Sequence, residues 1–179
     1  MHKRLGSFAA AIVFTIWGAG CADRSATPVS APSKTAPPAA PAVRVTVLQD
    51  GSTFDSRSLI GKKVLVLRFQ ASYCKPCARE SPALGRLTER YRARGVEVLA
   101  IHVQDAAVDV RRFMRANKVT YPVALDPRLT IGNRYGFKGT PYTVVIDRQG
   151  EIVTRLHGES AVTRLPRLLD EILKKEPPS

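Results

Sequence analysis

The sequence predicts an α/β fold in which a central mixed β-sheet is covered by helices on both faces. Three patterns predict this fold: strand–helix–strand over residues 64–103, a hairpin over residues 142–156, and an amphipathic helix over residues 162–172. Parallel neighbours in a sheet need a crossover connection, whereas a hairpin joins antiparallel strands. A chain that contains both kinds of connection should therefore build a mixed sheet.

The first half of the pattern supplies a buried strand, a helix and a second strand. Residues 64–67 are a valine and leucine run, as expected for a central strand that is buried on both faces. Apolar residues recur at helical spacing from Leu84 to Tyr91, and Gly95 is a natural stop for that helix. Residues 96–103 predict the next strand.

The second half supplies the hairpin and the remaining helices. Gly150 can adopt the positive φ that the hairpin turn needs, and Pro166 lies in the first turns of the closing helix, where proline is best tolerated. Residues 43–54 suggest a small N-terminal hairpin at the sheet edge. The other expected elements are a helix at 107–114, an extended segment at 121–125, a brief helix at 128–135, strands at 142–146 and 151–156, and the helix at 162–172.

Residues 1–21 predict a secretory signal rather than part of the fold. Positive residues come first, a short apolar stretch from Leu5 to Trp17 follows, and small residues lead to Cys21. A cysteine in that position resembles the lipobox of bacterial lipoproteins, in which it is lipidated and becomes the mature N-terminus, although Gly18 departs from that motif. The alternatives are ordinary cleavage with an unmodified thiol and an uncleaved anchor.

The chain then divides into a linker and one domain. Residues 22–42 are mostly Ala, Pro, Ser and Thr without apolar periodicity, which predicts a semi-rigid spacer. Residues 43–179 are enough for a single hydrophobic core. The domain should thus be held off a membrane by its spacer.

The charge favours anionic partners but not nucleic acid. The formal net charge is +13, and a basic surface attracts acidic proteins or an anionic membrane face. The basic residues are scattered, aromatic residues make up only 7% of the chain, and no nucleic-acid-binding motif accompanies them. We therefore expect no nucleic-acid partner.

Cys74-Lys75-Pro76-Cys77 follows the predicted buried strand and opens a helix. The unpaired N–H groups and the dipole at a helix N-terminus stabilise an anion, so the thiolate of Cys74 should be favoured. Cys77, one turn inside the helix, is placed to attack a mixed disulfide formed at Cys74. The motif predicts a nucleophilic Cys74 and a resolving Cys77.

Two other interpretations of the cysteines are a structural disulfide and half of a zinc site. Zinc would need further ligands, but Cys21 belongs to the leader, and His102 and His157 are isolated without paired spacing. We expect His102 at a strand end and His157 at the surface or in the hairpin. No metal or cofactor is therefore predicted; the redox centre would be the cysteine pair itself.

Further motifs give the chain a resemblance to a known family. Residues 43–175 resemble the TlpA/ResA-like branch of bacterial thioredoxin-like proteins, which are membrane-tethered and generally act as reductants. The resemblance implies a three-layer thioredoxin-like fold. The motifs, in order, are Asp50-Gly51, Gly61-Lys62-Lys63-Val64, Tyr73-Cys74-Lys75-Pro76-Cys77, Glu80 with Pro82, Tyr121-Pro122, Asp126-Pro127, Thr140-Pro141 and Ile146-Asp147-Arg148-Gln149-Gly150.

The resemblance also implies roles for residues around the dithiol. A cis peptide bond before Pro141 would lie beside it, and the Thr140 backbone would pair with an extended substrate. Tyr73 and Pro76 would belong to the substrate-facing surface. Glu80 would lie near the dithiol, where burial could raise its pKa and let it exchange protons with Cys77. The alternatives are a trans loop proline and a solvated helical glutamate.

The chain departs from the family at three positions near the dithiol. Tyr73 replaces the usual Trp and Gln70 replaces an aromatic residue, which makes the substrate-facing surface less apolar. Arg68 stands where thioredoxins carry a buried Asp and this branch often Asn. A guanidinium near the sulfurs would stabilise the Cys74 thiolate and make the pair more oxidising, whereas a side chain reaching solvent would have no effect.

The leading hypothesis is an exported, membrane-tethered thiol-disulfide oxidoreductase in the periplasm or at the extracytoplasmic membrane face. It would act as a monomer, reduce disulfides of exported proteins during cytochrome c or metal-site maturation, and be re-reduced by a membrane electron donor of the DsbD/CcdA type. The alternatives are a DsbA-like oxidant, a copper-delivery module, which typically has CxxxC, and a structural lipoprotein. A thiol peroxidase is disfavoured because Ala71 occupies the position of its threonine.

Overall fold

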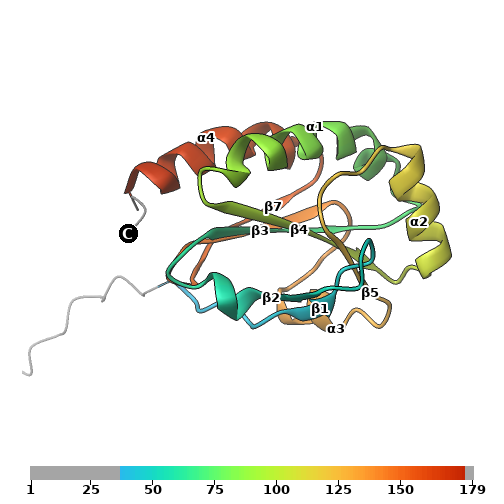
Figure 1. Ribbon diagram of the computed structural model, residues 1–179, viewed down its shortest axis with the longest axis horizontal. Helices are drawn as coiled ribbons and strands as arrows, with labels where there is room; N and C mark the ends of the chain where they lie inside the picture. Colours follow the sequence, from blue (N-terminus) through green and yellow to red (C-terminus); the bar gives the residue numbers. More distant parts are fainter. Residues whose placement is uncertain (1–36, 176–179) are drawn as a thin grey trace, which may run out of the picture. The chain divides into compact units, whose positions relative to one another are not determined.

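The computed structural model describes residues 37–175, which build a five-stranded sheet with the strand order β5-β4-β3-β6-β7 (Figure 1). Strand β3 is central and pairs in parallel with β4 and antiparallel with β6. The mixed sheet that the two kinds of connection predict is confirmed. Its strands are β3 (Val64–Gln70), β4 (Val96–Val103), β5 (Val123–Asp126), β6 (Tyr142–Ile146) and β7 (Ile152–His157).

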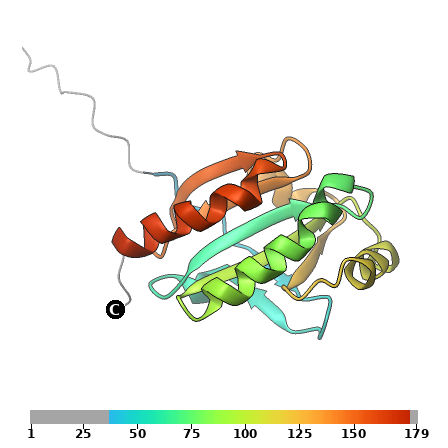
Figure 2. The same cartoon turned by 90° about the horizontal axis from the view of Figure 1, so that it is seen from above.

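Helices cover both faces of this sheet. The helices α1 (Lys75–Arg92) and α4 (Ser160–Lys175) lie side by side on one face, where residues such as Leu84 and Leu169 pack on Val66 (Figure 2). The short helix α3 (Thr130–Arg134) packs on the other face. The helix α2 (Ala107–Ala116) connects β4 to β5. The apolar periodicity therefore identified the buried face of each long helix.

Central strand β3 is longer than its apolar run. All seven of its residues are buried, including Arg68 and Gln70, which are each 1% exposed. The sequence predicts a strand over residues 64–67 because the valine and leucine run covers those residues. The strand continues because both polar side chains find partners inside the protein.

The N-terminal hairpin forms a sheet of its own. Strands β1 (Arg44–Thr46) and β2 (Thr53–Asp55) pair with each other, and the following helix is a 3₁₀ turn (Ser56–Leu59). The hairpin does not extend the main sheet as a further strand; the segment after β1 contacts edge strand β5 through a 2.7 Å bond from Leu48 N to Val123 O.

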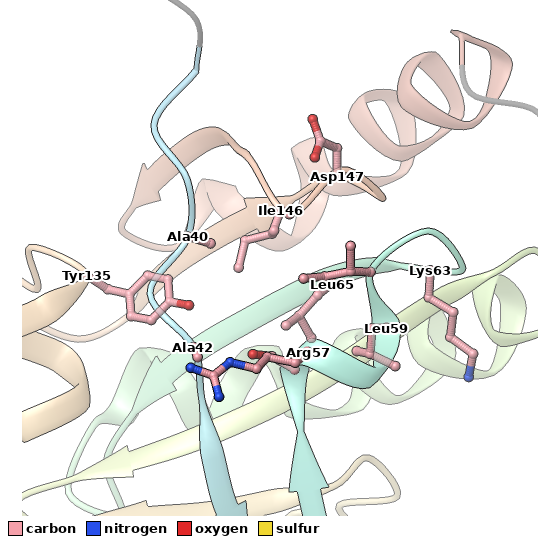
Figure 3. A pocket seen from close by; sticks show the side chains of 12 residues that line it. Ala40, Ala42, Arg57, Leu59, Lys63, Leu65, Tyr135, Ile146 and Asp147 are labelled. Atoms are coloured by element: carbon pink, nitrogen blue, oxygen red, sulfur yellow. The ribbon is translucent and has the colours of Figure 1, made fainter.

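Part of the segment that the sequence places in the linker is bonded to the domain. The Ala40 N–H donates to Gly150 O at 2.8 Å, and the Ile152 N–H donates to Pro38 O at 2.9 Å. Tyr135 donates its hydroxyl to Pro41 O. The bonds of Pro38 and Ala40 lie at the end of the sheet where β3 begins, and Tyr135 lines a pocket of about 220 Å³ together with Leu65 and Ile146 (Figure 3). The rest of the predicted linker and the predicted signal lie outside the described residues.

Within residues 37–175, no helix has both the length and the apolar character needed to cross a membrane.

Candidate active site

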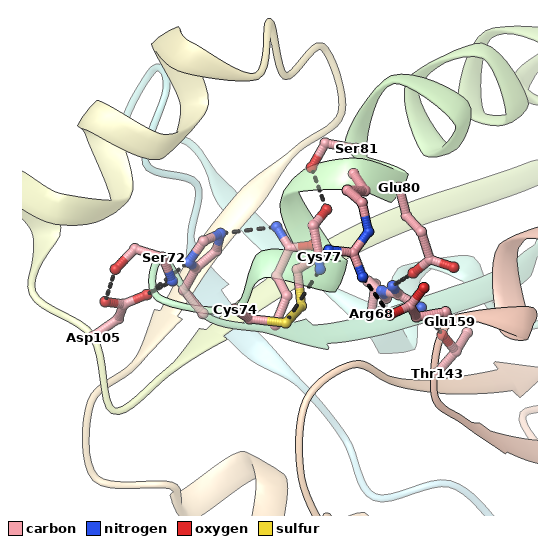
Figure 4. Close-up of a disulfide and its surroundings, with 12 residues drawn as sticks. Arg68, Ser72, Cys74, Cys77, Glu80, Ser81, Asp105, Thr143 and Glu159 are labelled. Atoms are coloured by element: carbon pink, nitrogen blue, oxygen red, sulfur yellow. Dashed lines mark hydrogen bonds and ion pairs between the residues drawn. A yellow bond between two sulfur atoms is a disulfide. The ribbon is translucent and has the colours of Figure 1, made fainter.

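The two cysteines of the motif form a disulfide at the start of α1 (Figure 4). Cys74 is the N-cap residue of the helix, and its sulfur accepts the Cys77 backbone N–H at 3.2 Å. Pro76 occupies the first turn, where its missing N–H leaves no helical bond unmade. Cys74 is 6% and Cys77 1% exposed. An incoming sulfur therefore reaches Cys74 more readily than Cys77.

This local structure follows from the sequence around the motif. The buried strand β3 ends at Gln70, four residues form the connection, and α1 begins at Lys75. The Cys74 N–H donates to Ala71 O at 3.1 Å, which closes the turn between strand and helix. The helix N-terminus then points its free N–H groups toward the Cys74 sulfur, where a thiolate would carry negative charge.

Behind the dithiol, Arg68 and Glu80 form a buried ion pair. Arg68 donates to the Glu80 carboxylate and, at 2.9 Å, to Thr143 Oγ1 on β6. The Glu80 side chain is 13% exposed, and burial raises the pKa of its carboxyl against the opposing effect of Arg68. Burial likewise lowers the pKa of Arg68, opposed by Glu80. Arg68 thus stays inside the protein instead of reaching solvent.

The pair is only partly satisfied by hydrogen bonds. Arg68 Nε and Glu80 Oε1 are both buried without a hydrogen-bond partner in the described structure. A buried charge that lacks part of its hydrogen bonding depends strongly on its remaining partner. The charge of Arg68 is therefore balanced mainly by Glu80, which lies one helical turn after Cys77.

The residues that the resemblance assigns to substrate binding surround the same end of the sheet. The peptide bond between Thr140 and Pro141 is cis. Tyr142, which follows, pairs with Phe69 near the end of β3, so the cis bond lies at the edge where the dithiol connection begins. Tyr73 is 66% exposed and stands at the surface next to Cys74. Cys21, the predicted lipidation site, lies outside the described residues.

A family model described as Redoxin matches residues 34–170. The chain belongs to the Redoxin family. Among curated proteins, the redoxin is 33% identical over 132 residues to the thiol-disulfide oxidoreductase ResA of Halalkalibacterium halodurans, over 73% of this chain and 74% of that protein. The ResA of Bacillus anthracis is 31% identical over 123 residues, 69% of this chain and 70% of that one.

Solved structures agree with this assignment. The redoxin resembles a thiol:disulfide interchange protein of the thioredoxin family from Chlorobium tepidum TLS, with a TM-score of 0.70 and 25% identity over 79% of this chain and 99% of that one. The predicted thioredoxin-like fold and the resemblance to ResA-like proteins are confirmed. The redoxin is a thiol-disulfide oxidoreductase, and the Cys74–Cys77 pair is the disulfide that it contains within the described residues.

The redoxin also contains a polar network beside the dithiol that sequence reasoning missed. His102 on β4 lies 2.8 Å from Gln70 Nε2 and 2.9 Å from Asp105 Oδ2, and it is fully buried. Asp105 in turn accepts the backbone N–H and the hydroxyl of Ser72, both at 2.6 Å. Burial lowers the pKa of His102 against the opposing effect of Asp105. The expectation that His102 ends a strand is met, but its partners were not foreseen.

The signal that could have revealed this network is weak. His102 and Asp105 are three residues apart, and Gln70 stands next to His102 only because β3 and β4 pair in that register. Among residues 37–175, no group of three or more His, Cys, Asp or Glu side chains could hold a metal ion. His157, exposed at the end of β7, stacks on Tyr142 with ring centroids 4.5 Å apart.

Proposed function

We propose that this redoxin is exported, is held at a membrane by its N-terminal segment, and reduces disulfides in exported proteins. The observation that carries the proposal is the Cys74–Cys77 pair at the N-terminus of α1, with the Cys74 sulfur accepting a helical N–H. The signal-like pattern of residues 1–21, with Cys21 as the candidate lipid anchor, supports export and tethering.

The reaction begins with the reduced dithiol. The Cys74 thiolate attacks one sulfur of a substrate disulfide, the other substrate sulfur leaves as a thiolate, and a mixed disulfide forms. The Cys77 thiolate then attacks the Cys74 sulfur and releases the second substrate sulfur. The substrate gains two electrons and two protons, and the enzyme keeps the Cys74–Cys77 disulfide. A membrane electron donor would return the pair to the dithiol, and no further cofactor is needed.

Neighbouring residues support each step. Thr140 lies outside the β6 ladder, which begins at Tyr142, so its backbone can pair with an extended substrate segment across Cys74. Tyr73 and Pro76 offer apolar contact to that segment. Glu80, whose pKa burial raises, is suited to accept the proton of Cys77 before the resolving attack.

A trapping experiment tests the proposal. With Cys77→Ser, the mixed disulfide cannot be resolved, and exported proteins should remain attached to Cys74 in cell extracts. The matched control Cys74→Ser, which keeps the second cysteine, should capture nothing. Recovery of cytoplasmic proteins alone would reject the exported location, and equal capture by both variants would reject Cys74 as the nucleophile.

The reduction potential separates a reductant from an oxidant. A reductant should equilibrate with glutathione at a potential near that of thioredoxin, about −270 mV, whereas a DsbA-like oxidant lies near −120 mV. A value at the DsbA end would overturn the direction of transfer and leave the exchange chemistry intact. An insulin-reduction assay in which Cys74→Ser abolishes the activity completes the test.

A further inference from the structure

Asp105 connects the loop after β4 to the loop that carries Cys74. Its carboxylate accepts three short hydrogen bonds, two from Ser72 and one from His102, and it is only 8% exposed. Ser72 is two residues before Cys74, in the connection between β3 and α1. The position of that connection therefore depends on a carboxylate that belongs to a different strand–helix loop (Figure 4).

The hydrogen-bond partners of His102 define how its ring is protonated. The side-chain amide nitrogen of Gln70 can only donate, so His102 Nε2 must accept. The proton of the neutral ring then lies on Nδ1 and is donated to Asp105. Both oxygens of the carboxylate are thus oriented, one by His102 together with the Ser72 N–H and the other by the Ser72 hydroxyl.

The surrounding backbone is arranged to bring Asp105 to this place. Gln104, the preceding residue, has a left-handed φ of 51°, which residues other than glycine seldom adopt. Its N–H is held by Asp126 O at 3.1 Å. Phe113 of α2 packs edge-on against His102, with ring centroids 5.1 Å apart, and belongs to the same buried cluster as Cys74 and Cys77.

We propose that Asp105 is a positioning residue for thiol-disulfide exchange: through Ser72 it holds Cys74 where its sulfur meets an incoming disulfide, and His102 and Gln70 hold Asp105. The proposal rests on the exchange activity of Cys74. The proposed role of Asp105 concerns the position and orientation of the Cys74 sulfur rather than the ionisation of its thiol. A loop that moves still carries a thiolate, but it presents that thiolate to a bulky substrate less often in a reactive geometry.

Two rate constants measured on the same protein distinguish an effect on the orientation of Cys74 from an effect on its ionisation. The full chain carrying Cys21→Ser and Cys77→Ser leaves Cys74 as the single thiol. Iodoacetamide, a small reagent, reports the thiolate, whereas mixed-disulfide formation with insulin also requires the correct orientation. The readout is the ratio of the rate constant for insulin to the rate constant for iodoacetamide. Adding Asp105→Ala should lower this ratio by about tenfold to 100-fold.

Three further variants keep the test decisive. Asp105→Asn retains an oxygen that can accept the Ser72 N–H, so it should recover part of the lost ratio. Ser72→Ala removes one of the two bonds and should lower the ratio less than Asp105→Ala. Asp147→Ala removes a similarly buried carboxylate, which accepts the Glu151 N–H at 2.8 Å at the opposite end of the sheet, and should leave the ratio unchanged.

The outcomes distinguish this inference from the proposed function. The positioning role is rejected if Asp105→Ala leaves the ratio unchanged, or if Asp147→Ala lowers the ratio as much as Asp105→Ala does. In both cases the parent still exchanges disulfides, so the proposed function stands. If Asp105→Ala does not fold, the ratio of Ser72→Ala against that of the parent decides. A parent chain that forms no mixed disulfide with insulin at all would instead reject the proposed reduction of protein disulfides.

Discussion

Arg68 on β3 and Glu80 on α1 form an ion pair in the interior of the protein, one helical turn beyond Cys77. The exposed fractions of their side chains are 1% and 13%. The two charges balance each other in a place where neither is well hydrated. The pair therefore matters both for the stability of the domain and for the electrostatic field at the sulfurs.

Removing Arg68 should destabilise the domain because it leaves the Glu80 carboxylate buried without its counter-ion. We expect Arg68→Met to lower the free energy of unfolding by about 3–5 kcal/mol, measured by urea denaturation at neutral pH. The double variant Arg68→Met/Glu80→Gln removes both charges and should recover most of that loss. A single variant as stable as the parent would contradict the buried pair.

Removing the negative charge should make the dithiol more oxidising. In Glu80→Gln the positive charge of Arg68 is no longer balanced, so it stabilises the thiolate form of the reduced pair. A decrease of about one unit in the pKa of the Cys74 thiol raises the reduction potential by at most about 30 mV, a limit that is reached when the thiol is ionised at the pH of the measurement. Thiolate titration and glutathione equilibration measure the two quantities.

The control for this experiment is Glu159→Gln, because Glu159 pairs with Arg79 at the surface and is 55% exposed. Its removal should change the potential much less, since solvent screens exposed charges. If Glu80→Gln and Arg68→Asn both leave the thiol pKa unchanged, the ion pair has no part in the redox chemistry.

His102 should make the domain less stable in mild acid. Burial depresses the pKa of His102 below the ordinary value of 6.5. As the pH falls below 6.5, the unfolded chain therefore binds a proton at His102 more readily than the folded chain does. Its contribution to stability is complete above pH 6.5 and is lost as the pH falls below that value. The slope reaches at most about 1.4 kcal/mol per pH unit.

The variant His102→Asn isolates this effect, because its amide can still donate to Asp105 but does not titrate in this range. Denaturation curves at pH 7 and pH 5 should show a smaller loss of stability in the variant than in the parent. Glu80 acts in the opposite direction, since its raised pKa adds stability as the pH falls toward 4.5. Equal losses in parent and variant would exclude a contribution from His102.

Residues 37–42 should stabilise the domain, although their composition is that of a linker. A chain that starts at Val43 loses the bonds of Pro38, Ala40 and Pro41, and its free energy of unfolding should fall by about 1–3 kcal/mol relative to a chain that starts at Pro37. Hydrogen exchange at the Ile152 amide gives a local reading, because its acceptor is Pro38 O. Unchanged protection there would contradict the contact.

Local patterns were sufficient to predict most elements of the fold. The strand over residues 96–103 and the hairpin strand over residues 142–146 have the bounds that the apolar runs indicate. The motif Cys74-Lys75-Pro76-Cys77 predicted the helix start because proline and the N-cap cysteine act within one turn. The cis bond at Thr140-Pro141 agrees with what the family resemblance implies.

Contacts between distant residues could not be predicted in the same way. Arg68 and Glu80 are 12 residues apart and meet only when α1 packs on β3, and Gln70 and His102 are 32 residues apart. Apolar periodicity says which face is buried, but it contains no information on strand register. The partners of polar residues within apolar strands can therefore be identified only when the strand register and the helix packing are known.

The bonds of Pro38 and Ala40 also determine at which end of the sheet the described chain begins. These residues pair beside Glu151 and Ile152, level with the start of β3, whereas the dithiol follows the end of β3. The described chain therefore begins at the end of the sheet opposite the dithiol, and these bonds hold the N-terminal residues away from Cys74.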